Sequence, residues 1–355
     1  MARSEPGRVD LSVVIPSYNG AEWLPSTLEA LAVAVDRSGW TAEVIVIDDG
    51  STDSTRDVLA ALAPSFPVEL IAVHQENRGR FLARWEGIQR ASGRYTLLID
   101  SRVLIGADSL AYVARGVAAD PSAVAWNAHT DTDPCAPLVG RFWEVPTYVF
   151  WGAYLGDPRP TRIEPQNFDR VPKGTTCFLL ETALFEEACR AVWPEGDPRL
   201  TSDDTKLLRY IAGRTPIVLD PGFQAVYRPR TSVRAFLDHS RTRGTLFVDS
   251  YAGTSATRDL VLLGLALSVP VALGVIAAAA AARLWWLVVG VPIVAVLVII
   301  APALLAGARR CPPRAVAGYL LYIIPFGAVF WLGLVRGIVV HRRSFRTRRQ
   351  STEKV

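Results

Sequence analysis

The chain has 355 residues, half of them apolar, and a formal net charge of +4. This length suffices for one large domain with an additional element, and the apolar residues concentrate after about residue 259, where Leu, Val, Ile and Ala predominate. Basic residues gather at positions 341–349 beside an apolar stretch, an arrangement that typically faces anionic lipid. No basic stripe interleaved with aromatic residues occurs elsewhere, which argues against nucleic acid as a partner.

The first hundred residues alternate between short apolar runs and segments with helical spacing. Strands are predicted at residues 11–15, 43–47, 68–73 and 95–99, and helices at residues 21–35, 54–62 and 79–91. This alternation predicts an α/β fold, in which a mostly parallel sheet carries helices on both faces. Ligands bind such sheets at the carboxyl ends of the strands. Polar residues at 17–19, 48–51 and 100–102 therefore predict a site on that edge.

The middle of the chain, residues 125–230, is rich in Trp, Pro and Gly and less regular. A strand is predicted at residues 176–180 and a helix at residues 204–211. The cysteines form no CxxC pair and the four histidines have no ligand spacing, so neither a zinc site nor a disulfide framework is expected. The four cysteines are expected to be free thiols: Cys135, Cys177, Cys189 and Cys311.

Two long apolar segments predict a helical hairpin in a membrane. Residues 260–282 and 284–308 each exceed the roughly 20 residues that cross a bilayer, and only Arg283 separates them. The neighbouring Trp285 and Trp286 suit a membrane–water boundary. Before the hairpin, residues 231–258 mix Arg with Phe and Leu, which is typical of an interfacial amphipathic segment.

A third apolar segment, residues 315–340, contains Pro325. The N-terminus lacks the apolar stretch of a signal peptide, so the N-terminal domain is expected on the cytoplasmic side. Three full spans would then place the basic tail, residues 341–355, outside the cell, against the positive-inside tendency. The sequence therefore favours a multi-pass protein of the cytoplasmic membrane, with two spans and a third segment that bends back at Pro325 or lies in the interface.

Four motifs fall at or near the predicted strand ends: residues 13–20, 46–53, 77–79 and 93–100. In this order and spacing they resemble the family-two inverting glycosyltransferases of the GT-A fold, and the resemblance covers roughly residues 10–240. Each motif alone is moderately specific, whereas their combined order and structural context are highly specific. The resemblance implies a catalytic domain at residues 1–230, followed by a transmembrane region at residues 259–340.

The resemblance implies donor-binding roles for Pro16, Tyr18, Asn19, Asp49 and Gly50. Tyr18 offers an aromatic face to a nucleobase, and the Asp49 carboxylate can accept a hydrogen bond from the base. Gly50 allows the backbone to approach the nucleotide closely. As an alternative, Tyr18 is a packing residue at a strand end and Asp49 a turn residue that needs no ligand.

Basic residues complete the implied donor site. Arg84 matches a family position near the donor and is expected to pair with phosphate. Arg228 and Arg230 occur where related enzymes bring a basic loop over the diphosphate, with lipid phosphates as the alternative partner. Residues 173–176 are assigned to the acceptor entrance.

The sequence departs from the family at residues 100–102. The family usually has two aspartates here, and the second helps to hold Mg2+ or Mn2+ on the donor diphosphate. Asp100 is present, but Arg102 stands in the second position. Because a guanidinium repels a cation and attracts a diphosphate, we hypothesise that Arg102 partly or wholly replaces the metal. The alternatives are a metal held by Asp100 with other ligands, or an inactive relative.

Asp203 and Asp204 resemble the family's acidic element at the start of a helix. In an inverting reaction one carboxylate removes the proton from the acceptor hydroxyl. The resemblance assigns this role to Asp204, with Asp203 orienting it or serving in its place. As an alternative, these residues only cap the helix, since Asp is favoured there for ordinary reasons.

Together these features predict an inverting transferase that moves a sugar from a nucleotide-sugar donor to a lipid-linked acceptor in cell-envelope polysaccharide synthesis. The expected acceptor is a polyprenyl phosphate or a polyprenyl-diphosphate glycan, and membrane lipids are expected partners. Two further hypotheses stay open. One is a catalytically silent GT-A binding subunit, and the other is a transferase that uses a nucleotide-activated alcohol or phosphosugar.

Overall fold

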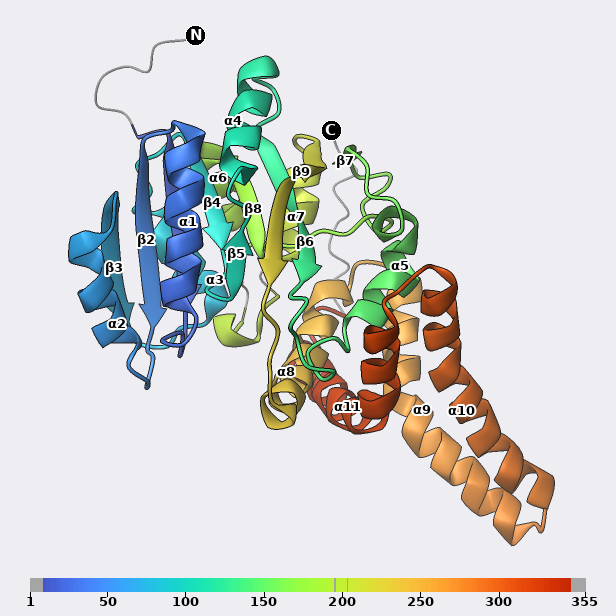
Figure 1. Ribbon diagram of the computed structural model, residues 1–355. Helices are drawn as coiled ribbons and strands as arrows, with labels where there is room; N and C mark the ends of the chain where they lie inside the picture. Colours follow the sequence, from blue (N-terminus) through green and yellow to red (C-terminus); the bar gives the residue numbers. More distant parts are fainter. Residues whose placement is uncertain (1–8, 195, 203, 346–355) are drawn as a thin grey trace. The chain divides into compact units, whose positions relative to one another are not determined.

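The computed structural model describes residues 9–194, 196–202 and 204–345 (Figure 1). The chain divides into two compact units, and each is described by itself. The first consists of the described parts of Met1–Cys135 and Asp157–Pro229, and the second of those of Ala136–Gly156 and Arg230–Val355. The sequence boundary near residue 230 therefore falls between units. Residues 136–156, expected in the catalytic domain, instead belong to the second unit, because their apolar side chains pack against its helices.

The described residues of the first unit form a nine-stranded mixed sheet in the order β3-β2-β1-β4-β8-β6-β9-β5, with β7 paired to β9. The half formed by β3, β2, β1 and β4 is parallel, as expected, whereas β8 runs antiparallel to β4 and β6. The strands are β1 (Leu11–Ser17), β2 (Ala42–Asp49), β3 (Glu69–Gln75), β4 (Tyr95–Ile99), β5 (Val103–Ile105), β6 (Ala125–Thr132), β7 (Thr161–Ile163), β8 (Cys177–Glu181) and β9 (Ile217–Tyr227).

Helices cover both faces of this sheet. They are α1 (Leu24–Ser38), α2 (Thr55–Leu62), α3 (Arg80–Ile88), α4 (Ser109–Ala119), α6 (Thr182–Ala191) and α7 (Thr205–Ala212). Because side chains alternate across a strand, Val44 and Val46 pack in one cluster with residues of α1, α2 and α4. Ile45 and Ile47 pack instead with Ala83 of α3. The predicted α/β architecture is confirmed, with element ends that match or shift by at most three residues, the largest shifts being at α1 and α3.

The second unit is helical. Besides α5 (Glu144–Leu155), it contains α8 (Val233–Tyr251), α9 (Ala256–Ala281), α10 (Trp285–Ala308) and α11 (Pro313–Val340). Helices α9, α10 and α11 are long and apolar enough to cross a membrane. Arg283 adopts a positive φ of 58°, and the backbone N–H of Leu284 donates to Ala279 O at 2.8 Å. This tight connection joins α9 and α10 as the predicted hairpin.

Helix α11 runs without a break through Pro325. The expectation that the chain bends back at this proline is therefore wrong. Proline removes one backbone hydrogen bond, and neighbouring helices readily compensate for this loss in apolar surroundings. Here α11 packs tightly along α8, since a Cβ added at Gly244 of α8 would lie only 2.3 Å from Phe330 O. Helix α8 carries charged residues throughout its length, including Arg234, Asp238 and Arg241.

The four cysteines are free, as expected. Cys177, Cys189 and Cys311 are buried, and burial raises the pKa of each thiol. Cys135 is exposed.

Candidate active site

The loops after β1 and β2 are bound to each other. Asn19, with a positive φ of 51°, donates its N–H to Ser51 Oγ at 2.8 Å and accepts from the N–H of Thr52 at 2.8 Å. Gly50 also has a positive φ, of 75°, and a Cβ there would lie 2.6 Å from the backbone nitrogen of Asn77. A side chain at residue 50 would therefore push the loop after β2 away from the segment that follows β3.

Among the predicted nucleobase contacts, Tyr18 and Asp49 differ in exposure. Tyr18 is 53% exposed, so its ring is accessible for stacking. Asp49 is buried and accepts hydrogen bonds from the backbone N–H groups of Arg78 at 2.8 Å and Gly79 at 2.9 Å, at the start of α3. The Asp49 carboxylate thus anchors a helix N-terminus, where negative charge is favoured.

Pro16 lies inside β1, opposite Ile47 of β2, and is buried. Its place in the strand brings Tyr18 and Asn19 to the carboxyl end of the sheet. Because β1, β2 and β4 are parallel neighbours, the ends that carry Tyr18, Asp49 and Asp100 lie along one edge. This is the edge at which open α/β sheets bind ligands.

Arg84 is buried inside the first unit, where it holds Asp100. Its Nη2 donates to Asp100 Oδ1 at 2.9 Å, and its Nη1 donates to Thr175 Oγ1 at 2.7 Å. The sequence predicted a phosphate partner for Arg84, whereas in the structure its guanidinium binds protein oxygens. Arg84 therefore positions the Asp100 carboxylate at the end of β4 and ties it to the segment before β8.

Arg102 lies over the ring of Trp23, with the guanidinium carbon 4.2 Å from the ring centroid. Its Nη1 also donates to Pro229 O at 3.2 Å. Burial lowers the pKa of the Arg102 guanidinium, while Tyr227 and Glu22 raise it. A guanidinium stays charged even so, and its partial desolvation strengthens its attraction for an anion.

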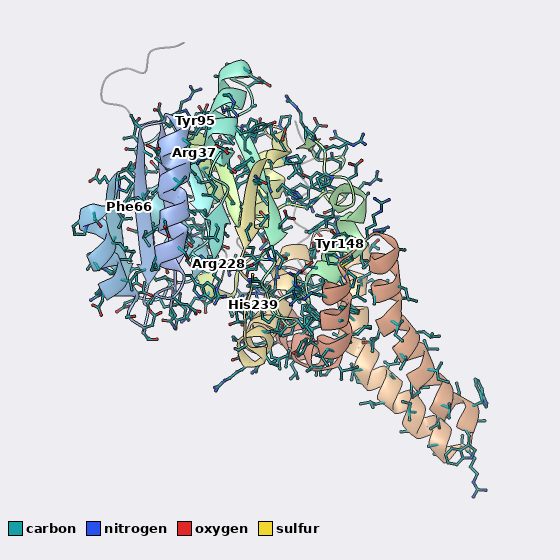
Figure 2. The ribbon with its side chains drawn as sticks, viewed as in Figure 1. Arg37, Phe66, Tyr95, Tyr148, Arg228 and His239 are labelled. Atoms are coloured by element: carbon teal, nitrogen blue, oxygen red, sulfur yellow. The ribbon has the colours of Figure 1, made fainter. Side chains whose placement is uncertain are left out.

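Arg228, labelled in Figure 2, lies against the same indole. Its guanidinium donates to Trp23 O at 3.1 Å and to the hydroxyls of Ser26 and Thr27. Burial lowers the pKa of Arg228, and the positive charge of Arg102 lowers it further. Two guanidinium groups thus meet at one aromatic ring. Trp23 was not predicted as a site residue, and only its position shortly after the Tyr18 motif could have indicated it.

The residues at this edge do not fit a divalent cation well. Asp100 already binds Arg84, and the next expected ligand position is the cation Arg102. Within the described residues, no group of three or more His, Cys, Asp and Glu side chains is placed to hold a metal ion. The donor set therefore favours a guanidinium as the positive charge of this site.

Asp204 stands at the N-cap of α7. Its Oδ1 accepts hydrogen bonds from Ser202 Oγ at 3.1 Å, from Thr205 Oγ1 at 3.0 Å and from the N–H of Thr205. Asp203, the predicted partner of Asp204, lies outside the described residues. Asp204 therefore satisfies the capping interpretation, and a cap of this kind also holds the carboxylate in a fixed direction.

Lys173 lies close enough to Asp204 for their charges to interact. Its Nζ is 4.3 Å from the ring centroid of Phe168, and Arg209 lies over the same ring at 4.4 Å. Burial lowers the pKa of the Lys173 ammonium to about 8, against the opposing attraction of Asp169 and Asp204.

In the wild-type protein, Lys173 makes the free energy of unfolding depend on pH. We expect the Lys173→Met variant to lack this dependence. The folded-state pKa of about 8 lies below the ordinary value of 10.5, so between these values the unfolded chain binds a proton that the folded chain does not. Stability from this residue therefore rises with pH across that window. Thermal unfolding in detergent, compared between the two proteins from pH 7.5 to pH 10, measures it. A difference that does not change with pH would contradict the assignment.

Arg230 is half-buried and is the first residue of the second unit after Pro229. The sequence grouped it with Arg228, but the two arginines belong to different units. Thr175 was included in the predicted acceptor segment, but only the fold reveals its bond to Arg84.

Residues 12–146 match the family described as Glycosyl transferase family 2. This part of the chain is a family 2 glycosyltransferase domain. The domain is 37% identical over 92 residues to the uncharacterized glycosyltransferase YibD of Escherichia coli, covering 26% of this chain and 25% of that protein. It is also 37% identical over 102 residues to the undecaprenyl-phosphate 4-deoxy-4-formamido-L-arabinose transferase of Serratia proteamaculans, covering 28% of this chain and 31% of that one. The chain thus matches only a quarter to a third of the length of these relatives.

The fold extends beyond the family 2 domain. The mannosyltransferase PcManGT of Pyrobaculum calidifontis, solved with GDP-Man and Mn2+, aligns with a TM-score of 0.51 and 18% identity. The alignment covers 89% of this chain and 88% of that one. At this identity the likeness concerns the fold alone, and it confirms the expected GT-A fold.

Proposed function

We propose that the chain is an inverting glycosyltransferase that moves a sugar from a nucleoside-diphosphate donor to a lipid-linked acceptor at the cytoplasmic membrane face. One observation carries this proposal: a family 2 domain with its motif residues on one sheet edge precedes three apolar helices in a single chain. An anchor of this kind suits an acceptor that is itself confined to the membrane. The name of the undecaprenyl-phosphate relative points to the same acceptor class.

In the proposed reaction the acceptor oxygen attacks the anomeric carbon from the side opposite the diphosphate. A bond forms between these two atoms while the bond from the anomeric carbon to the diphosphate oxygen breaks. Where the attacking oxygen belongs to a hydroxyl, as in a polyprenyl-diphosphate glycan, Asp204 takes its proton, and the nucleoside diphosphate leaves. Tyr18 stacks on the base of the donor.

Arg102 is proposed to stabilise the negative charge that develops on the leaving diphosphate. Its guanidinium is held in a fixed position on Trp23, and a charge fixed before the reaction stabilises a transition state without further rearrangement. Arg228 adds positive potential beside it and holds the backbone oxygens of Trp23 and Arg102. No metal-bound step is required in this scheme.

A transfer assay tests the proposal. Full-length protein in phospholipid vesicles is given radiolabelled UDP-sugars or GDP-sugars with polyprenyl phosphate or a lipid extract that contains polyprenyl-diphosphate glycans. We expect label in the organic phase. Donor binding without hydrolysis or transfer would instead favour the silent subunit. Mass spectrometry of lipid-linked intermediates from cells that lack the protein would then identify the acceptor that accumulates.

The helices of the second unit support a specific topology. A charged side chain in the centre of a bilayer is costly, and α11 packs along α8, which carries charges throughout. We therefore propose that α9 and α10 cross the membrane, while α11 lies with α8 in the cytoplasmic interface. The basic residues that follow α11 then stay on the cytoplasmic side, in agreement with the positive-inside tendency.

Cysteine labelling in sealed cells checks this topology. In a variant without the four native cysteines, Arg283→Cys in the hairpin turn is expected to react with an impermeant maleimide added outside. Arg342→Cys, which is exposed after α11, is expected to react only after the cells are opened. Labelling of Arg342→Cys from outside would mean that α11 crosses the membrane.

A further inference from the structure

Residues 136–156 connect two strands of the sheet but belong to the helical unit. The chain leaves the first unit after Cys135, forms α5 and returns at Asp157 before β7. Helix α5 is rich in large aromatic residues and includes Tyr148, Phe150 and Trp151. Neither the family motifs nor the proposed reaction assigns it a role.

An aromatic cluster fixes the start of this segment within the second unit. The ring of Phe142 lies 4.4 Å from that of Phe326 and is stacked on Tyr319 at 5.3 Å, both in α11. Val145 is fully buried in the same cluster as Ala303 and Ala306 of α10. Helix α5 is therefore packed against two of the apolar helices.

Arg309, which follows the last residue of α10, holds α5 beside that end of the helix. Helix α10 ends at Ala308, and the next residue donates from its Nη1 to Tyr148 O at 3.1 Å and to Val149 O. A Cβ added at Gly152 would lie 2.5 Å from Arg309 Cδ, so the arginine side chain lies directly across α5. Tyr148 is labelled in Figure 2. Helix α5 thus lies where the apolar stretch of α10 gives way to charged residues.

Phe150 of α5 is exposed near this end of α10. It follows Val149, whose carbonyl oxygen binds Arg309, and its side chain is 71% exposed. The backbone leaves helical geometry at the next residue, Trp151, with φ −125° and ψ 17°. A large apolar ring exposed to water is unfavourable, whereas Phe is typical of the apolar face of helices that lie in the membrane interface.

We propose that α5 is an interfacial membrane-binding helix, whose Phe150 ring inserts among phospholipids at the boundary between headgroups and acyl chains. The proposal rests on the proposed insertion of α9 and α10 in the membrane, because Arg309 places α5 at the end of α10. The partner is the lipid surface itself, since α5 is bound at the end of α10, a helix long and apolar enough to cross a membrane. A second copy of the chain is the competing occupant.

This placement has a consequence for the family 2 domain. The two units are joined through the chain after residues 135, 156 and 229. With α5 in the interface, residues 136–156 give the chain a contact with the lipid surface in addition to α9 and α10. The first unit is then linked to the lipid surface through residues 136–156 as well as through α8.

Photo-crosslinking tests the proposal with the full-length protein. Benzoylphenylalanine replaces Phe150, and the protein is placed in vesicles of phosphatidylcholine and phosphatidylglycerol, irradiated and analysed by mass spectrometry. Leu297 of α10, 60% exposed, is the positive control, and Val33 of α1, 40% exposed, is the control in the sheet unit. We expect phospholipid adducts at positions 150 and 297, in several-fold higher yield than at position 33.

The outcomes separate this inference from the proposed function. Adducts at position 297 without adducts at position 150 would overturn the role of α5 and leave the membrane hairpin standing. A lack of adducts at both positions would overturn the membrane placement itself. Crosslinks from position 150 to a second copy of the chain, or equal lipid adducts at position 33, would also overturn the proposal.

Discussion

Asp204→Asn is expected to bind the donor normally and to lower the turnover of sugar transfer by about 10²- to 10⁴-fold. The amide cannot take a proton from the acceptor hydroxyl. Asparagine caps a helix nearly as well as aspartate, so the bond to the N–H of Thr205 and the start of α7 are retained. Donor titration and transfer kinetics on the same preparation measure both parts of this prediction.

Two further variants serve as controls for Asp204→Asn. Asp204→Ala removes the cap as well as the base, so its unfolding temperature is expected to fall together with its turnover. Asp108→Asn changes another aspartate at an N-cap position, that of α4, where the side chain pairs with Arg37 and makes no capping hydrogen bond, and is expected to keep full turnover. Near-normal turnover of Asp204→Asn would refute the role of Asp204 as base. That result would favour a polyprenyl phosphate acceptor, whose oxygen is already ionised and needs no base.

Arg102→Ala is expected to lower turnover by about 10²- to 10³-fold, the usual effect of removing one preorganised charge from a transition state. The wild-type protein is expected to keep its activity in EDTA, because the positive charge at the diphosphate comes from a guanidinium held on Trp23. Arg115→Ala is the matched control, since Arg115 also lies over an aromatic ring, that of Tyr112. It is expected to have no effect on turnover.

A substitution that restores the carboxylate usual in the family gives a second test of metal independence. Arg102→Asp would recreate the two-carboxylate pattern with Asp100 and is expected to recover activity only when Mn2+ or Mg2+ is added. Complete loss of wild-type activity in EDTA, restored by Mn2+, would reject metal independence. Asp100 would then have to leave its bond to Arg84 to bind the ion.

Local patterns in the sequence were sufficient for the parallel half of the sheet. Strands β1 to β4 are continuous apolar runs that end in polar residues, and this pattern depends on neighbours in the chain. The mixed half was mostly missed, because β6 and β9 are irregular and their pairing shifts register between Ala128 and His129. The three apolar segments were predicted for a similar local reason, since length and composition alone indicate them.

The sequence by itself determined the fold class, the motif positions along one sheet edge and the apolar hairpin, because each follows from residue type and spacing. Only the tertiary structure decided which partner each charged side chain has. Arg84 binds both Asp100 and Thr175, which is far from it in the chain. Arg102 meets Trp23 because β5, which follows it, packs against α1. The membership of α5 in the helical unit likewise depends on contacts with α10 and α11. Contacts between residues far apart in sequence leave no periodic signal, so they become visible only once the chain is folded.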